Sequence, residues 1–175
     1  GMRPEEMLAI RVGNITSDGN ETIISITSVL DRDGKTIKDY PKTDAGRRSL
    51  PVDDYTADTV RAWIELKSEM MRKMGLKPSM SMLVCGPEMI PRTYQSWHRD
   101  WMRFAAEAGF EGVRPYALRH TFATLNLANG ENIKTVAVLM GHASSAYTLD
   151  LYAAYVPNTG IGIGTRYMNF LRAAA

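Results

Sequence analysis

The chain is poor in cysteine and in long hydrophobic runs, and both absences exclude classes of protein. Its single cysteine, Cys85, cannot form an internal disulfide, which favours a reducing compartment. No apolar run reaches the roughly 18 residues that a membrane-spanning helix requires, and no secretory signal peptide is recognisable. We therefore expect a cytoplasmic protein without a membrane partner, in which Cys85 is a core residue.

The chain also lacks the usual motifs of metal and nucleotide sites. It has no C-x-x-C, no H-x-x-x-H and no group of carboxylates at ligand spacing. No glycine-rich G-x-x-x-x-G-K-[ST] loop is present, and the run G-I-G-I-G at 160–164 follows no strand, which favours a linker. We expect neither a metal nor a cofactor.

The net charge is small, because 21 lysines and arginines are balanced by 19 acidic residues. A charge of +2 is compatible with nucleic-acid binding and does not require it. The basic residues are clustered, however. One group falls within fourteen positions and the other on an expected helix: Lys35, Lys38, Lys42, Arg47 and Arg48, then Arg92, Arg99 and Arg103.

The length and the hydrophobic content of 45% indicate one domain with its own core. Asp-Gly turn signals at 18–19 and 33–34 bracket a β-branched run, T-I-I-S-I-T-S-V-L, which predicts a strand. The segments K-T-I-K-D-Y and R-R-S-L-P-V complete one small antiparallel sheet. Helices are expected at about 4–11, 56–74, 91–109 and near the C-terminus, the third burying Trp97, Trp101 and Phe104. The expected fold is therefore α+β, mainly helical.

Residues 116–155 predict three short helices separated by glycines. In the first, from about 115 to 128, the spacing of Leu118, Phe122 and Leu125 predicts a buried face. Gly130 and Gly141 suit helix C-termini. Asn132 is a plausible N-cap of the second helix, whose buried face would comprise Ile133, Val136, Ala137 and Met140, and Ser144 or Ser145 can cap the third.

Four polar residues in this stretch suggest a single site. Tyr116 and Arg119 lie one helical turn apart, His142 follows at a helix corner, and Tyr152 comes ten residues later. Arginine offers a planar donor fork to two phosphate oxygens, histidine exchanges a proton near neutral pH, and tyrosine can be a covalent nucleophile. The set could converge on one phosphate.

These residues carry a resemblance to a known family. R-H-T-F-A-T, L-M-G-H-A-S-S and T-L-D-L-Y resemble the C-terminal boxes of the tyrosine recombinases, the phage integrase family. G-M-R-P-E-E-M-L-A-I-R resembles the first arginine box of that family, and K-T-D-A-G-R-R-S-L-P-V resembles its lysine-bearing β-turn. The resemblance implies the DNA breaking–rejoining fold of a catalytic domain over 1–175, with the family's N-terminal DNA-clamping domain absent. A flexible linker and a terminal helix would occupy 156–175.

The resemblance also implies a chemistry and its partners. Tyr152 would attack a DNA phosphate to give a 3′-phosphotyrosyl link, which needs no cofactor because the link stores the phosphodiester. Arg3 and Arg119 would hold the phosphate oxygens, Lys42 would protonate the leaving 5′ oxygen, and His142 would belong to the site. The partner would be double-stranded DNA, bound by a tetramer of the full-length protein during integration or excision of a mobile element. This chain alone would be a monomer.

Three positions are open on the residues alone. Tyr116 stands where the family usually has histidine; it can donate a hydrogen bond but is a poor base, so any general-base work would shift to His142. His120 points about 100° away from Arg119 on the helix and is expected to be buried and structural. Tyr155 is the nearest rival of Tyr152 as nucleophile.

Other function classes are open too. The stretch from Asn132 to Tyr152 could be a helix-turn-helix that binds DNA without chemistry, and the chain could be an inactive integrase remnant. A type IB topoisomerase-like enzyme would use the same nucleophile to relax DNA as a monomer.

Overall fold

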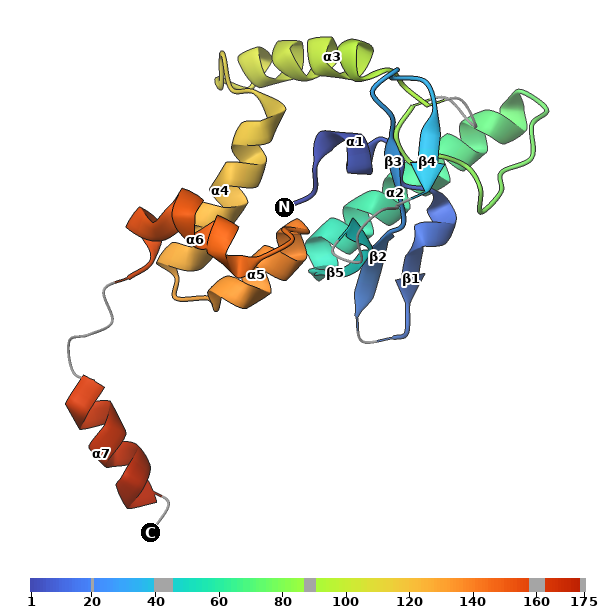
Figure 1. The fold of residues 1–175 in the computed structure, drawn as a ribbon. Coiled ribbons are helices and arrows are strands. Elements are labelled where there is room, and N and C mark those ends of the chain that lie inside the picture. The colour runs from blue at the N-terminus through green and yellow to red at the C-terminus, as the bar shows by residue number, and fades with distance from the viewer. Residues whose placement is uncertain (20, 40–45, 87–90, 158–162, 174–175) are drawn as a thin grey trace.

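The computed structural model describes residues 1–19, 21–39, 46–86, 91–157 and 163–173. These residues form mostly helices, together with short antiparallel strands (Figure 1). The elements in chain order are α1 (Pro4–Met7), η1 (Val12–Asn14), β1 (Ile15–Ser17), β2 (Thr22–Ile26), β3 (Ser28–Leu30), β4 (Ile37–Asp39), β5 (Arg48–Val52), α2 (Asp54–Lys73), α3 (Tyr94–Glu107), α4 (Pro115–Ala128), α5 (Ile133–Met140), α6 (Ser145–Tyr152), η3 (Ala153–Tyr155) and α7 (Ile163–Ala173). The mainly helical α+β fold predicted from the sequence is confirmed.

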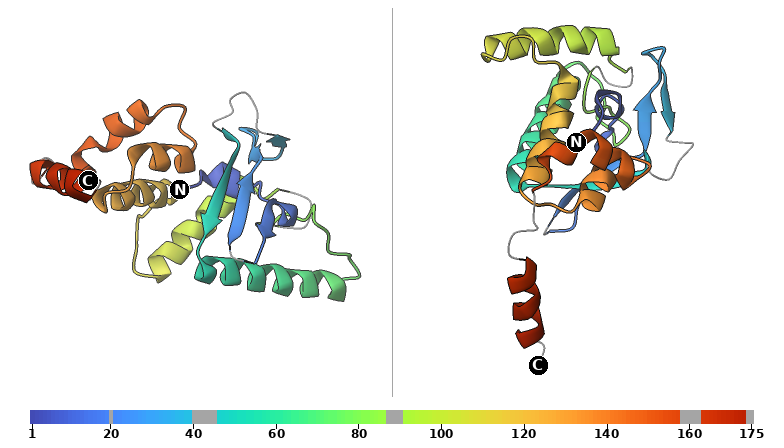
Figure 2. Two further views of the ribbon diagram at one scale, coloured as in Figure 1. Left: turned by 90° about the horizontal axis from the view of Figure 1, so that it is seen from below. Right: turned by 60° about the vertical axis from the view of Figure 1, so that its left-hand side comes forward.

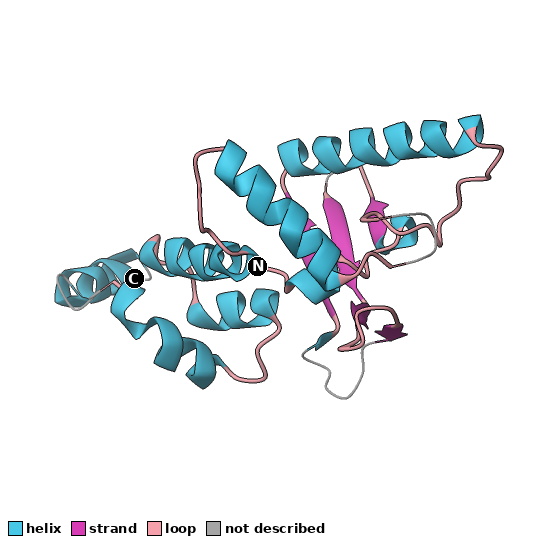
Figure 3. Cartoon of the chain, turned by 90° about the horizontal axis from the view of Figure 1, so that it is seen from above, coloured by secondary structure: helices cyan, strands magenta, loops and turns pink. Residues whose placement is uncertain are grey.

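The elements fall into two groups with the N-terminus between them. The strands lie beside α2 on one side of the molecule, and α4, α5 and α6 gather on the other (Figures 1 and 2). The long α2 runs along the strands, as Figure 3 shows with helices in cyan and strands in magenta. Helix α7 stands apart from both groups in Figure 1 and in the right-hand view of Figure 2.

The strands form two sheets, whereas the sequence predicted one. β1, β2 and β5 make an antiparallel sheet with β2 in the centre, and β3 pairs only with β4 within the described residues. The run from Thr22 to Leu30, expected as one strand, is interrupted at Thr27, so its two halves pair with different partners. β1 was not predicted.

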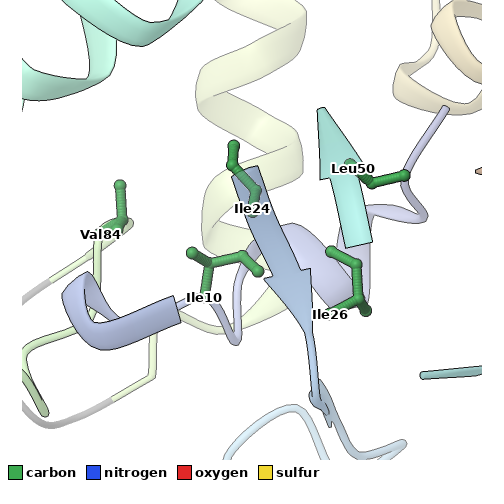
Figure 4. Packing of buried hydrophobic residues seen from close by; sticks show 5 residues of the cluster. All are labelled: Ile10, Ile24, Ile26, Leu50 and Val84. Carbon is green, nitrogen blue, oxygen red and sulfur yellow. The ribbon is translucent and has the colours of Figure 1, made fainter. Parts of the chain in front are cut away.

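The first core lies on one face of the central strand. Along β2 the side chains alternate between buried and half-buried, which directs Ile24 and Ile26 inward. They pack with Ile10, Leu50 and Val84, which come from segments far apart in the sequence (Figure 4). The half-buried Cys85 packs against this core, in line with its expected structural role.

Helix α1 ends at Met7, four residues earlier than predicted. The next residues leave the helix because they bond to the segment around Leu83. Val84 donates its N–H to the Ile10 carbonyl at 2.9 Å, and Val12 donates to the Met82 carbonyl at 2.8 Å. A single β-bridge joins Arg11 to Leu83. The short α1 is therefore fixed directly to the sheet core.

The long helices bury less apolar surface than the sequence suggested. Helix α2 is capped by Asp53, and its Leu66 is 51% exposed. The next residue, Lys67, is buried instead, and its ammonium donates hydrogen bonds to the carbonyls of Leu83 and Gly86. In α3 the predicted buried stripe is wrong at Phe104, which is 60% exposed. The other two members of that stripe are half-buried.

The second core joins α4, α5 and α6. The face predicted for α4 is wrong at Leu118 and Leu125, which are exposed. Phe122, the third predicted member, packs at the edge of the core, whereas Ala123 and Leu127 are buried in it. The face predicted for α5 is largely confirmed, with Val136, Ala137 and Met140 buried and Ile133 packed at its edge. The predicted caps are confirmed too: Asn132 accepts from the Lys134 N–H at 2.8 Å and Ser144 from the Tyr147 N–H at 3.3 Å.

The predicted terminal helix is present as α7, and its described apolar side chains, such as Phe170, are exposed. Most of the expected linker, at 158–162, lies outside the described residues. Within the part of the chain that is described, no helix is long and apolar enough to span a membrane.

Candidate active site

Five of the six predicted site residues line one cavity of about 230 Å³ between the two halves of the molecule. Its lining consists of Arg3, Tyr116, Arg119, His120, His142, Tyr147, Leu151 and Tyr152. The sixth predicted residue, Lys42, lies outside the described residues.

Arg3 is fixed at the start of α1 by the helix itself. Its backbone N–H and its Nη1 both donate to the Glu6 carboxylate, at 2.7 Å and 2.8 Å. Its Nη2 donates to the Gly141 carbonyl at 3.2 Å, which ties α1 to the end of α5. The guanidinium is thereby held at the boundary between the two halves, with its side chain 31% exposed.

Glu6 is the buried anion that supports this arrangement. Its side chain has no exposed surface, and Arg48 contacts both of its oxygens, at 3.0 Å and 2.7 Å. Arg48 also donates from Nε to the Leu139 carbonyl at 2.7 Å. Burial raises the pKa of the Glu6 carboxyl, but hydrogen bonding and charge from Arg48 and Arg3 outweigh burial and lower it to about 2. Glu6 therefore stays ionised and offsets the clustered arginines.

Arg119 occupies the buried face of α4, with only 6% of the residue exposed. Its Nη1 donates to the Gly1 carbonyl. Burial, followed by the charge of Arg3, lowers its pKa to about 10, so the guanidinium is still a cation at neutral pH. Two fixed positive charges thus border the cavity.

His142 is placed by the C-terminus of α5. Gly141 adopts the left-handed conformation, with φ of 68°, which ends the helix and turns the chain toward the cavity. The Nδ1 atom of His142 lies 2.7 Å from the Thr148 hydroxyl, and Tyr147 packs edge-on against the ring. Burial, and then the charges of Arg119, Arg3 and Arg48, lower its pKa to about 4. The imidazole is neutral at pH 7.

Tyr116 donates its hydroxyl to the Glu5 carboxylate at 3.1 Å. Burial, and next the neighbouring Glu5, raise the pKa of this phenol to about 12. Tyr116 is therefore a neutral hydrogen-bond donor at physiological pH, in keeping with the expectation that it is a poor base.

Tyr152 is the last residue of α6 and is 4% exposed. Its ring belongs to the second core, and its hydroxyl is 2.7 Å from Nδ1 of His120. The rival Tyr155 lies in η3, is 51% exposed and is not among the residues that line the cavity. The prediction that His120 is buried is wrong, because the residue is exposed and its ring borders the cavity.

The arrangement combines two guanidinium groups, a neutral imidazole and a phenol around a space open to a ligand. Preorganised cationic donors of this kind stabilise the charge that develops on a phosphate under attack. Among the described residues, no three histidine, cysteine, aspartate or glutamate side chains are grouped as metal ligands. A phenol beside two guanidinium groups is a set suited to nucleophilic attack on an anionic ester.

Three residues of the site were missed or misread from the sequence. Glu6 was not singled out in the sequence, although its position three after Arg3 is the spacing of a helical ion pair. Arg48 was noted only as a member of a basic cluster, and the pattern gave no signal that it would be buried. His120 follows Arg119 directly, and its contact with Tyr152 depends on how α6 packs on α4.

Comparison with known proteins places this geometry in a family. The model of the phage integrase family matches residues 1–158. The ICEBs1 integrase of Bacillus subtilis is 24% identical over 161 residues, which cover 90% of this chain and 43% of that protein. The chain thus spans less than half the length of this curated relative.

Two solved structures share the fold. The Tn1549 transposon integrase in complex with transposon right end DNA superposes with a TM-score of 0.69 at 20% identity, over 99% of this chain and 55% of that one. The crystal structure of XerA recombinase gives a TM-score of 0.62 at 19% identity, over 97% and 52% of the two chains. With a family match over nine-tenths of its length, the chain belongs to the phage integrase family, the tyrosine recombinases.

Proposed function

We propose that this chain is the catalytic domain of a site-specific DNA recombinase, which cleaves and rejoins strands through a 3′-phosphotyrosyl intermediate. The observation that supports this most directly is the shared cavity, in which Arg3, Arg119, His142 and Tyr152 meet from four separate segments. One DNA phosphate in the cavity would face both guanidinium groups and the Tyr152 hydroxyl.

The proposed roles follow from the chemistry of each group. Arg3 and Arg119 bind the non-bridging oxygens and neutralise charge in the pentacoordinate transition state. The neutral His142 donates a hydrogen bond to the phosphate, and Tyr116 does so by releasing the Glu5 carboxylate to which it donates in the free chain. Tyr152 is the nucleophile. Lys42 is proposed as the general acid for the leaving 5′ oxygen, on the strength of the β-turn motif alone.

We further propose that double-stranded DNA is the partner and that the full-length protein acts as a tetramer on two DNA sites in the cytoplasm. The Tn1549 integrase was solved with transposon DNA, which supports a role in integrating or excising a mobile element. In this organisation residues 156–175 comprise a linker and the terminal helix, which the linker joins to the rest of the catalytic domain. The DNA-clamping domain of the full-length protein would precede the catalytic domain.

A covalent-capture experiment tests the chemistry without knowledge of the target site. The chain is incubated with nicked duplexes of randomised sequence, because the nick lets the short product leave and traps the covalent complex. DNA that resists denaturing detergent is sequenced, and the linked residue is identified by mass spectrometry. We expect adducts on Tyr152 in the wild type and none in Tyr152→Phe.

The other function classes give different results. A non-catalytic DNA-binding module or an inactive remnant would retain DNA without any adduct in either chain. A topoisomerase-like enzyme would form the adduct and relax supercoiled plasmid of any sequence, whereas a recombinase would enrich particular sequences around the cleaved phosphate.

A further inference from the structure

The Tyr152 hydroxyl already has a partner suited to remove its proton. Nδ1 of His120 lies 2.7 Å from it, and the two ring centroids are 5.8 Å apart. Among the described residues, His120 is the partner to which the Tyr152 hydroxyl is hydrogen-bonded. The contact joins α4 to the end of α6, and the second core packs around Tyr152, which holds its hydroxyl beside α4.

Two other polar side chains of the cavity make hydrogen bonds elsewhere. Nδ1 of His142 faces the Thr148 hydroxyl, and Tyr116 donates to Glu5. Arg3 and Arg119 are cations and cannot accept a proton. Burial raises the pKa of Tyr152 further from neutrality, although Arg119 opposes this, so the phenol carries its proton at pH 7 and needs a base.

We propose that His120 is a catalytic residue that accepts the hydroxyl proton of Tyr152 during strand cleavage. This inference rests on the proposed function. As Oη of Tyr152 forms its bond to phosphorus, the proton passes to Nδ1 of His120 and the bond from phosphorus to the 5′ oxygen breaks. The leaving oxygen keeps the bonding pair and takes a proton from the general acid. Rejoining reverses each transfer.

The place of His120 fits this role. For Nδ1 to accept a proton, the neutral ring carries its hydrogen on Nε2. The residue is exposed, so the imidazolium formed in the step stays in contact with water. Its neighbour Arg119 belongs to the same helix, so α4 carries both the proposed base and one of the two arginines that would bind the phosphate.

Replacing His120 with asparagine distinguishes a general base from a residue that only accepts a hydrogen bond from Tyr152. In His120→Asn, the side-chain oxygen can take the place of Nδ1 and still accept a hydrogen bond, but it cannot remove a proton. We expect the rate of adduct formation to fall about 10²- to 10⁴-fold, the usual contribution of a general base. The matched control is His98→Asn, a histidine on α3 outside the cavity, which should cleave at the wild-type rate.

A more acidic nucleophile should then compensate for the missing base. Replacing Tyr152 with a ring-fluorinated tyrosine, whose phenol ionises more readily, should restore much of the rate to His120→Asn while changing the wild type little. A purely structural defect would not respond to the acidity of the phenol. Thermal unfolding of each variant verifies that it is folded.

The outcomes separate this inference from the proposed function. Adduct formation at the wild-type rate in His120→Asn, or no response to fluorination, overturns the role of His120 and leaves the recombinase chemistry standing. A wild-type chain that forms no adduct at Tyr152 overturns both. Nitrogen NMR gives a readout besides activity: the hydrogen on Nε2 of His120 should be observed, and the Nδ1 signal should shift in Tyr152→Phe.

Discussion

Glu6 is the residue on which the arginines of the cavity depend, because it is the fully buried anion between Arg3 and Arg48. We expect Glu6→Gln to lower the free energy of unfolding at pH 7 by about 3–5 kcal/mol, since it leaves buried charge uncompensated. The folded pKa of about 2 lies below the ordinary value of 4.5, so this stabilisation is present above pH 4.5 and lost toward pH 2. Denaturant titrations across that range measure it.

The matched control for Glu6→Gln is Glu65→Gln, which removes an exposed carboxylate paired with Arg72. It should cost about 0–1 kcal/mol. A difference between Glu6→Gln and the wild type that stayed constant from pH 7 to pH 2 would contradict the role assigned to the carboxylate.

His142 should titrate far below an ordinary imidazole. Burial and the nearby arginines lower its pKa from 6.5 to about 4, so folding favours the neutral ring and stability falls as pH drops through that window. In Arg119→Met we expect the pKa of His142 to rise, because one cation is removed. Proton NMR measures the midpoint, with His142→Asn to assign the signal; an unchanged midpoint in Arg119→Met would be the contrary result.

At the residue scale, the sequence motifs were enough to identify most of the residues that line the cavity as candidate site residues. Arg3, Tyr116, Arg119, His142 and Tyr152 were selected by spacing and resemblance, and the structure gathers them in one cavity. Their partners were harder to foresee. Glu5 pairs with Tyr116, and Glu6 pairs with Arg48. These partners are far apart in the sequence, so their contacts depend on packing that no local pattern encodes.

At the scale of elements, the turn between α5 and α6 sets the position of His142. Gly141→Ala should lower the free energy of unfolding by about 1–2 kcal/mol, because alanine is strained in the left-handed conformation that Gly141 adopts. It should also slow formation of the Tyr152 adduct, since His142 and the carbonyl that receives Arg3 would both move. Chemical denaturation and the nicked-duplex assay measure the two effects.

Gly130→Ala is the matched control for that turn. Gly130 has φ of 85° at the end of α4, with nothing near the position of an added Cβ, so its cost is the backbone strain alone. The two variants should lose similar stability, and only Gly141→Ala should lose cleavage. Equal cleavage by both would show that the α5–α6 turn does not position the site.

Elements were predicted best where local signals are strong. The caps and glycines predicted α4, α5 and the start of α6 nearly to the residue, because side-chain caps and left-handed glycines act locally. The end of α6 was less certain, because the helix stops at Tyr152 and a 3-10 turn continues to Tyr155. Periodicity misjudged the buried face of α4, where Arg119 and small residues lie inward and Leu118 outward. A site helix that buries an arginine cannot be oriented by hydrophobicity alone.

At the scale of the whole molecule, the cavity exists because two cores meet. The sheet core carries Arg48 and, through α1, Arg3 and Glu6, while the helical core carries Arg119 and Tyr152. Arg3 and Arg48 cross the boundary to carbonyls at Gly141 and Leu139. The sequence predicted the class of fold and missed the second sheet, because strand pairing is a long-range choice.

Helix α7 lies outside both cores, so ending the chain at residue 157 should leave the stability of the rest unchanged. Its described apolar side chains, including Tyr167 and Phe170, are 62% and 71% exposed, so removing them takes little buried surface away. We expect the free energy of unfolding to change by less than about 0.5 kcal/mol, as for other exposed positions. Denaturant unfolding followed by tryptophan fluorescence measures it, because all three tryptophans precede residue 157. A loss of several kcal/mol would mean that α7 packs against the cores of the same chain.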